Sequence, residues 1–139
     1  MCSKATACDV GWAEALPEKC PRDRDQDPTG QTLYRWFDKT KAAPDASDFL
    51  SHEAMGLLRF PNACPCERRA VSMFGSLQYL RTSGRLRSVR DKKKFARITL
   101  MAGHGVVSPP DAKTHVSWWR CGGHDPVQTA SVVLETDAA

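Results

Sequence analysis

The sequence predicts an α+β domain with a mostly antiparallel sheet, two or three helices and a flexible N-terminal leader. Three observations lead to this fold class. A chain of 139 residues is enough for one hydrophobic core and too short for several domains. Its patterned segments follow the order strand, helix, strand, helix and then strands in succession, which favours antiparallel pairing. The first thirty residues contain few side chains to bury.

Residues 1–30 are expected to form the flexible leader. Trp12 and Leu16 are its main apolar anchors, and residues 21–28 alternate charged residues between two prolines. A run of this kind offers almost nothing to a hydrophobic core. Residues 31–139 are therefore expected to form the single α+β domain.

The first expected elements of this domain are a strand and a helix. Residues 31–37 gather aromatic and β-branched side chains directly after the turn signal at 28–30, which is typical of a strand. Asp45 or Ser47 is a candidate N-cap for the helix that follows. Its apolar residues fall near one face of a 3.6-residue period, at positions 46, 49, 50, 54, 57 and 58.

A short strand and a second helix are expected next. Residues 70–74 form a short apolar run after a loop with two prolines, which predicts a strand. Residues 75–81 carry Leu77 and Leu80 three positions apart, and Gly84 follows, which indicates a short helix that ends there.

The rest of the chain is expected to consist of strands. Residues 95–101 begin with alternating apolar and polar side chains, and a glycine-rich turn at 103–105 follows them. Two more strands are predicted at 115–120 and 129–135, separated by turn-forming residues at 122–126.

Positive charge is concentrated in one segment of the chain. The net charge is only +4, but residues 59–97 hold eleven basic and two acidic residues and so carry +9. Such a block can neutralise phosphates, and Tyr79 and Phe95 can stack on bases, so a nucleic acid or an acidic protein is a candidate partner. The alternative is a solvated helix face or loop. The candidate contacts are Arg85, Arg87, Arg90, Lys92, Lys93 and Lys94.

The six cysteines are expected to be free or metal-bound thiols in a cytoplasmic protein, because the N-terminus shows no signal-peptide pattern. No run approaches the ~20 apolar residues of a spanning helix, so no membrane contact is expected. A Cys-x-Cys and a Cys-x-x-His pair lie on turn-rich loops, where they are candidates for a tetrahedral zinc site. The ligands would be Cys64, Cys66, Cys121 and His124. Cys2, Cys8 and Cys20 are expected to be incidental.

Short motifs on these elements carry a resemblance to known proteins. The motifs are Leu33-Tyr34-Arg35, Asp48-Phe49-Leu50-Ser51, Ala70-Val71-Ser72-Met73-Phe74 and Phe95-Ala96-Arg97-Ile98. With them, residues 31–135 resemble a group of small uncharacterised bacterial proteins and, more remotely, the ADP-ribosyltransferase-type fold of bacterial toxins. The resemblance implies that NAD is bound, with Arg35 as the dinucleotide contact, Ser72 as the central-strand serine and Glu135 as the late glutamate. In that fold the glutamate stabilises the oxocarbenium ion that develops as the glycosidic bond breaks.

The same three residues also have structural explanations. Arg35 is then a strand-edge charge, Ser72 a core hydroxyl and Glu135 a solvated strand end. Position 133 is Val, where the family has the first residue of a Glu-x-Glu or Gln-x-Glu pair. Three functions are therefore open: an active or degenerate NAD-dependent ADP-ribosyltransferase-like protein, a non-catalytic module that binds nucleic acid or an acidic partner through residues 59–97, and a zinc-stabilised interaction domain. Whether the chain is an enzyme is also open.

Overall fold

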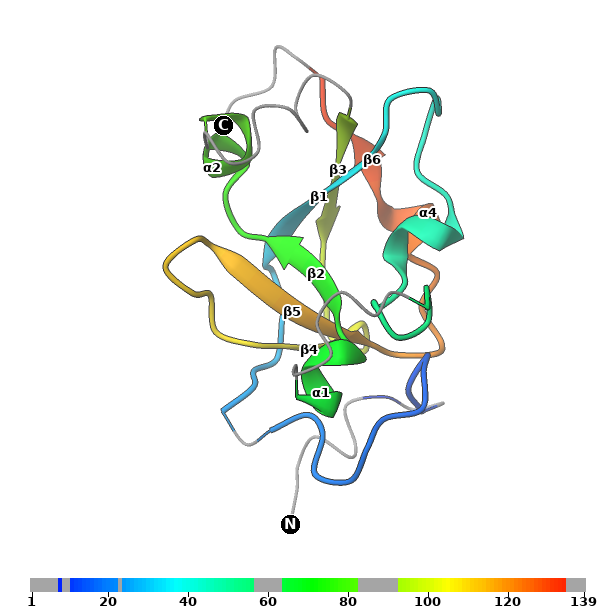
Figure 1. Cartoon of the computed structure of the whole chain (residues 1–139), viewed down its shortest axis with the longest axis vertical. Coiled ribbons are helices and arrows are strands. Elements are labelled where there is room, and N and C mark those ends of the chain that lie inside the picture. The colour runs from blue at the N-terminus through cyan, green and yellow to red at the C-terminus, as the bar shows by residue number, and fades with distance from the viewer. Residues whose placement is uncertain (1–7, 9–10, 23, 57–63, 83–92, 135–139) are drawn as a thin grey trace.

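The computed structural model describes residues 8, 11–22, 24–56, 64–82 and 93–134, with only the backbone at Lys93. Within these residues, six strands form one sheet in the order β4-β5-β2-β1-β3-β6, and every pairing is antiparallel. The strands are β1 (Thr32–Asp38), β2 (Val71–Phe74), β3 (Lys93–Thr99), β4 (Gly105–Val107), β5 (His115–Arg120) and β6 (Ser131–Val132). The expected α+β class with a mostly antiparallel sheet is confirmed (Figure 1).

The helices of the described part are all short. They are the 3-10 helix η2 (Ala46–Phe49) and the α-helices α1 (Pro65–Arg68), α2 (Leu77–Thr82) and α4 (Pro126–Thr129). None of these helices has the length and apolar character needed to cross a membrane.

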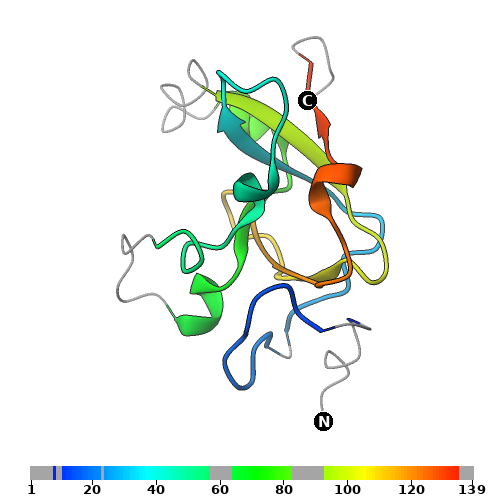
Figure 2. The ribbon, with the colours of Figure 1, turned by 90° about the vertical axis from the view of Figure 1, so that its right-hand side faces the viewer.

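One face of the sheet carries the main hydrophobic core. Side chains alternate between the two faces of a strand, so Leu33 and Phe37 of β1 point to the same face as Met73 of β2. The helices η2 and α4 lie over this face (Figure 2). Phe49 of η2 and Ala130, which directly follows α4, pack on the core. The buried members are Leu33, Phe37, Phe49, Val71, Met73, Ala96, Ile98, Leu100, Val107, Val116 and Trp118.

The opposite face carries two smaller clusters with polar residues between them. Leu77 and Leu80 of α2 pack there with Phe95, and Cys66 of α1 packs with Trp119 farther along the sheet. Ala70, just before β2, belongs to the cluster with Cys66 and Trp119. Phe74, the last residue of β2, packs against the cluster with Leu77 and Leu80. The register places Ser72 between them, opposite Ser117 of β5. The polar interruption in this face is where the candidate site lies.

Two disulfides join the N-terminal segment to the sheet: Cys8 to Cys121 and Cys20 to Cys66. The expectation of free or metal-bound thiols is therefore wrong for these four residues, and Cys8 and Cys20 are not incidental. Of the remaining cysteines, Cys64 is free and exposed.

The described part of residues 11–30 also makes non-covalent contacts with the sheet. Isolated β-bridges pair Trp12 with Cys121 and Gln26 with Val107. Pro21 and Asp25 are buried. The segment therefore buries more than its composition predicts, because disulfides and single bridges do not depend on a run of apolar residues.

The helix expected from residue 45 ends after one turn, which corrects the prediction. Asp45 is the N-cap of this turn, as the sequence predicts, and it forms a capping box with Asp48. The chain then becomes extended at Leu50, and Ser51 is buried. The Ser51 amide and hydroxyl donate to the Glu14 carboxylate at 3.1 and 2.5 Å, so a tertiary contact replaces the helical hydrogen bonds that periodicity predicts. The last two apolar positions of the expected helix lie outside the described residues.

Three short elements occur where the sequence indicates loops or turns. The helices α1 and α4 begin at Pro65 and Pro126, which fit the first turn of a helix. Strand β4 begins at Gly105, with φ +135°, and a Cβ there would lie 2.2 Å from the carbonyl oxygen of Trp119. Only glycine therefore allows β4 to approach β5 this closely. Because 126–129 is helical, the expected strand at 129–135 is found only in part, as β6.

Candidate functional site

A cavity of about 370 Å³ opens on the polar part of the second sheet face. Its walls come from three parts of the chain: the N-terminal segment, α1, and the stretch that connects β4 to β5 together with β5 itself. The lining residues are Arg24, Glu67, Ser108, Pro109, Pro110, Asp111, His115 and Ser117. Six of these eight side chains are polar or charged, so the cavity is suited to a polar ligand.

Glu67 of α1 is the central charged group of the cavity wall. The Ser117 hydroxyl donates to Glu67 Oε2 at 2.7 Å, and the Arg22 guanidinium donates to Oε1. Arg24 Nη2 lies 3.5 Å from the same Oε1. Burial alone raises the pKa of Glu67, but the Ser117 hydrogen bond and Arg22 outweigh it and keep the pKa below its ordinary value. Glu67 is therefore ionised at neutral pH.

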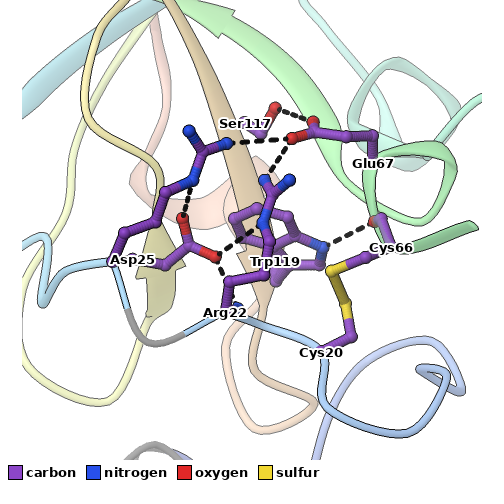
Figure 3. Close-up of a disulfide and its surroundings, with 8 residues drawn as sticks. Cys20, Arg22, Asp25, Cys66, Glu67, Ser117 and Trp119 are labelled. Atoms are coloured by element: carbon purple, nitrogen blue, oxygen red, sulfur yellow. Dashed lines mark hydrogen bonds and ion pairs between the residues drawn. A yellow bond between two sulfur atoms is a disulfide. The ribbon is translucent and has the colours of Figure 1, made fainter. Parts of the chain in front are cut away.

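Asp25 and the Trp119 ring hold Arg22 beside Glu67 (Figure 3). The buried Asp25 carboxylate accepts from the Arg22 amide at 2.7 Å, and its Oδ2 lies 3.6 Å from Arg22 Nε. The Arg22 guanidinium also lies over the Trp119 ring, 5.7 Å from its centroid. This arrangement orients Arg22 toward the Glu67 carboxylate through both charge and stacking.

The Cys20–Cys66 disulfide joins the two elements that carry these charges. Cys20 lies two residues before Arg22, and Cys66 immediately precedes Glu67 (Figure 3). The indole of Trp119 donates to the Cys66 carbonyl at 2.9 Å, and this hydrogen bond links α1 to β5. The disulfide thus places the N-terminal arginines beside α1.

The stretch between β4 and β5 forms the opposite wall. The Ser117 amide donates to the Ser108 hydroxyl at 2.9 Å, and the Ser108 amide donates to the Ser117 carbonyl at 2.9 Å. Asp111 Oδ1 accepts from the amides of Lys113 and His115 at 2.8 and 2.9 Å. These bonds hold the turn in which Pro109 faces the cavity.

His115 is the titratable base of the cavity. Its Nε2 lies 3.2 Å from the Ser72 hydroxyl, and its ring meets the Phe74 ring edge-on at 5.5 Å. Burial lowers the pKa of His115, and Arg35 adds to this effect; Asp111 and Glu67 oppose it without reversing it. The imidazole is therefore mainly neutral at pH 7 and able to accept a proton.

Of the three residues of the resemblance, the two that the structure describes, Arg35 and Ser72, point to opposite faces of the sheet. Arg35 shares a face with Leu33 and Phe37, whereas the Ser72 side chain lies on the other face. Arg35 Nη1 donates to the Ser72 carbonyl at 2.6 Å, and its Nε donates to the Asp48 carbonyl. The arginine thus reaches the backbone of β2 and η2. Glu135 lies outside the described residues.

The four proposed zinc ligands are separated by the disulfides. Cys66 and Cys121 are each bonded to a different cysteine, so neither offers a thiolate in this structure. His124 stacks on His104 with the ring centroids 3.7 Å apart, and its Nε2 lies 2.8 Å from the Thr129 hydroxyl. No group of three or more metal-ligating side chains occurs among the residues that the structure describes.

Most of the candidate nucleic-acid contacts fall outside the described ranges. Those residues are Arg85, Arg87, Arg90 and Lys92, together with the side chain of Lys93. Lys94 is half-buried, and its ammonium group donates to the Lys41 carbonyl at 2.7 Å.

Sequence reasoning missed Glu67, Ser117 and the arginines beside them. One signal was present: Glu67 is one of only two acidic residues in the basic segment 59–97. An isolated carboxylate among many cations is a candidate for a specific ion pair. Its partners, however, come from more than 40 residues away in the sequence, at Arg22 and Arg24.

Comparisons with known protein families, with curated proteins and with solved structures find no match to this chain.

Proposed function

We propose that this chain is a disulfide-stabilised binding domain that takes a small polar ligand into the cavity at Glu67 and His115. The observation that carries the proposal is the cavity itself. Its volume of about 370 Å³ lies at the small end of the range for ligand pockets, roughly 300–1,000 Å³. Its polar walls come from three segments that a disulfide and several hydrogen bonds hold together.

The charges around the cavity favour a ligand with both a cationic and an anionic end. The Arg24 side chain is 59% exposed and so is open to an anion, while the exposed Asp111 carboxylate is open to a cation. Pro109 and Pro110 supply an apolar surface beside these charges. A free amino acid or a short peptide has this combination of groups, so we assign the ligand to that class.

We also propose an oxidising compartment as the place where the domain works. Disulfides form and persist in such compartments and are rare in the cytosol, where thiols are kept reduced. The two disulfides each connect the N-terminal segment to a distant part of the fold. This proposal replaces the cytoplasmic location that the sequence predicts.

A ligand screen tests the binding proposal. Amide chemical shifts of the purified, oxidised protein would be recorded with amino acids and with di- and tripeptides, each compared with its N-acetylated and C-amidated form. We expect shifts at the lining residues with the zwitterions and weaker effects with the blocked forms. NAD belongs in the same screen, because the family resemblance predicts that it binds.

Variants then assign the contact. Asp111→Asn keeps the Oδ1 acceptor that shapes the turn but removes the charge, so affinity for zwitterions should fall about tenfold, as expected for one lost charged hydrogen bond. Glu18→Gln removes an exposed carboxylate outside the cavity lining and should leave affinity unchanged. Equal affinity in Asp111→Asn and the parent protein would refute this ligand class.

A second candidate function is nucleic-acid binding through residues 59–97. The observation that favours it is their charge of +9 within a chain whose net charge is +4. If the segment contacts phosphates, affinity for DNA or RNA falls steeply with salt. Replacing Lys92, Lys93 and Lys94 by Gln should then reduce the slope of log affinity against log salt by up to about 3. An unchanged slope would show that these lysines do not contact the phosphates and would contradict binding through this segment.

A further inference from the structure

Ser72 and His115 bring a hydroxyl and an imidazole together on the polar face of the sheet, beside the cavity that His115 lines. They belong to neighbouring strands, β2 and β5, and their side chains share the polar face of the sheet. Ser72 Oγ lies 3.2 Å from His115 Nε2, which is the reach that a nucleophile and its general base require. His115 itself lines the cavity.

The surroundings hold the backbone of both residues in place, and Phe74 also packs on the imidazole. In the sheet, Ser72 of β2 lies opposite Ser117 of β5. The Ser72 carbonyl accepts a hydrogen bond from Arg35 Nη1 at 2.6 Å. The His115 backbone amide donates to Asp111, and the edge of its ring contacts Phe74. Reactive groups on strands are held more exactly than groups on loops, because the sheet limits their movement.

The charged groups near His115 leave its ring able to accept a proton. Burial favours the neutral ring most strongly; Asp111 and Glu67 add negative charge on the cavity side, and Arg35 adds positive charge from the other face of the sheet. The neighbouring Ser117 is in a different position. Its hydroxyl donates to Glu67, a carboxylate held ionised by Arg22, and a carboxylate of low pKa is a weak base.

We propose that Ser72 is a nucleophile activated by His115, and that this pair transfers acyl groups from small esters that enter the cavity. The inference rests on the proposed function only in that both need the cavity to admit a ligand. Ser72 Oγ attacks the ester carbonyl carbon while His115 Nε2 takes the hydroxyl proton. The carbon–oxygen bond to the leaving group breaks, and the imidazolium returns the proton to the departing oxygen. Water then attacks the acyl-serine, with His115 again as base, and releases a carboxylic acid and free Ser72.

Covalent labelling with a biotinylated fluorophosphonate tests the proposal. This probe phosphonylates activated serines with loss of fluoride, and mass spectrometry of the digested protein identifies the residue. We expect Ser72 to be labelled, with a rate that rises with pH as His115 loses its proton. Ser72→Ala should abolish the labelling. His115→Gln should slow it about a hundredfold or more, the usual contribution of a general base.

Controls keep the result specific. Ser131→Ala removes an exposed serine on β6 outside the cavity and should leave the labelling rate unchanged. Thermal melts confirm that each variant is folded before it is labelled. Labelling of Ser117 in place of Ser72, absence of label at Ser72 in folded protein, or an unchanged rate in His115→Gln would each overturn the proposal.

The same variants separate this proposal from the binding function. If Ser72→Ala still binds amino acids or peptides while the parent protein is not labelled, the binding function stands and the nucleophile is refuted. If Ser72 is labelled but no zwitterion shifts the cavity resonances, the nucleophile stands and the ligand class is refuted.

Discussion

Arg35 illustrates how one residue can have a functional signal in the sequence and a structural role in the fold. The family resemblance assigns it to a dinucleotide, whereas the structure directs its guanidinium to the backbone carbonyls of Asp48 and Ser72. These bonds connect η2 to β2 across the core face of the sheet. The alternation of side chains explains the difference, since a residue's face depends on a strand register that one sequence does not reveal.

Replacing Arg35 tests this structural role. Arg35→Ala removes a charged donor from two carbonyls, and we expect the free energy of unfolding to fall by about 2 kcal/mol. Urea denaturation followed by tryptophan fluorescence measures it. Arg81→Ala, which removes a guanidinium that donates to the exposed Leu134 carbonyl, should cost much less. An unchanged midpoint in Arg35→Ala would contradict the structural role.

Gly105 gives a second test at the scale of single residues. Its φ of +135° and the 2.2 Å approach of its missing Cβ to the Trp119 carbonyl both exclude other residues. Gly105→Ala should therefore lower the free energy of unfolding by about 3 kcal/mol. Gly103→Ala is the matched control, because its φ of +85° is also positive but nothing lies within 4 Å of its Cβ position. A loss of about 1 kcal/mol is expected there. Equal losses in the two variants would show that close packing against β5 is unimportant.

At the scale of elements, local patterns predict most of the sheet but not its edges. Strands β1, β2, β3 and β5 and helix α2 follow from local sequence patterns; both ends of β5 are as predicted, and the ends of the others are shifted by at most two residues. Of the expected helix at 45–58, only the first turn forms within the described residues up to 56, because Glu14 binds Ser51. That contact spans 37 residues and leaves no local pattern.

The candidate site was predictable only in part for the same reason. Ser72 was singled out, but its partner His115 and the charged group at Glu67 depend on strand pairing and on a disulfide. Spacing suggested that Cys66 and Cys121 bind one zinc ion, and the structure pairs each with a cysteine of the N-terminal segment instead. Connectivity of cysteines cannot be deduced from spacing alone.

The two disulfides should have similar effects on stability and different effects on the site. Removing either pair as a double Ser variant should lower the free energy of unfolding by about 4 to 5 kcal/mol in the chain-entropy view. In the variant lacking Cys20 and Cys66, Arg22 is released from Glu67, and the pKa of Glu67 should rise toward its ordinary value of 4.5. Carboxyl chemical shifts recorded against pH measure it.

The variant lacking Cys8 and Cys121 is the matched control, since that disulfide does not join α1 to the arginines. It should lose stability while the pKa of Glu67 stays depressed. A depressed pKa of Glu67 in both double variants would show that the ion pair forms without the nearby disulfide.

At the scale of the whole molecule, stability should depend on pH through the stacked histidines. Burial, together with His104 and Arg120, lowers the pKa of His124 to about 4, and Asp125 opposes this only weakly. The unfolded chain takes up a proton near the ordinary value of 6.5, whereas the folded protein does not. The free energy of unfolding should therefore fall as the pH drops from about 6.5 to about 4.

Melting temperatures measured across this range check the prediction. His124→Asn should weaken the dependence between pH 6.5 and 4 without abolishing it, because the lowered pKa of His115 acts in the same window. Glu67 affects stability in a lower pH range. Because its pKa is lowered in the folded protein, its contribution to the free energy of unfolding is lost only as the pH falls below the ordinary value of 4.5. An identical pH profile in His124→Asn and the parent protein would contradict the role of the histidine pair.

The disulfide pattern also has a consequence for how the protein is made. A chain is synthesised from its N-terminus, so Cys8 and Cys20 appear well before Cys66 and long before Cys121, 113 residues after Cys8. Oxidation in order of appearance pairs two of the first three cysteines, Cys2, Cys8 and Cys20, whereas in the folded protein Cys8 and Cys20 are each bonded to a later cysteine. Reaching the native pairing then requires thiol–disulfide exchange after most of the chain has emerged. Efficient production of the protein should therefore depend on a disulfide isomerase as well as an oxidant.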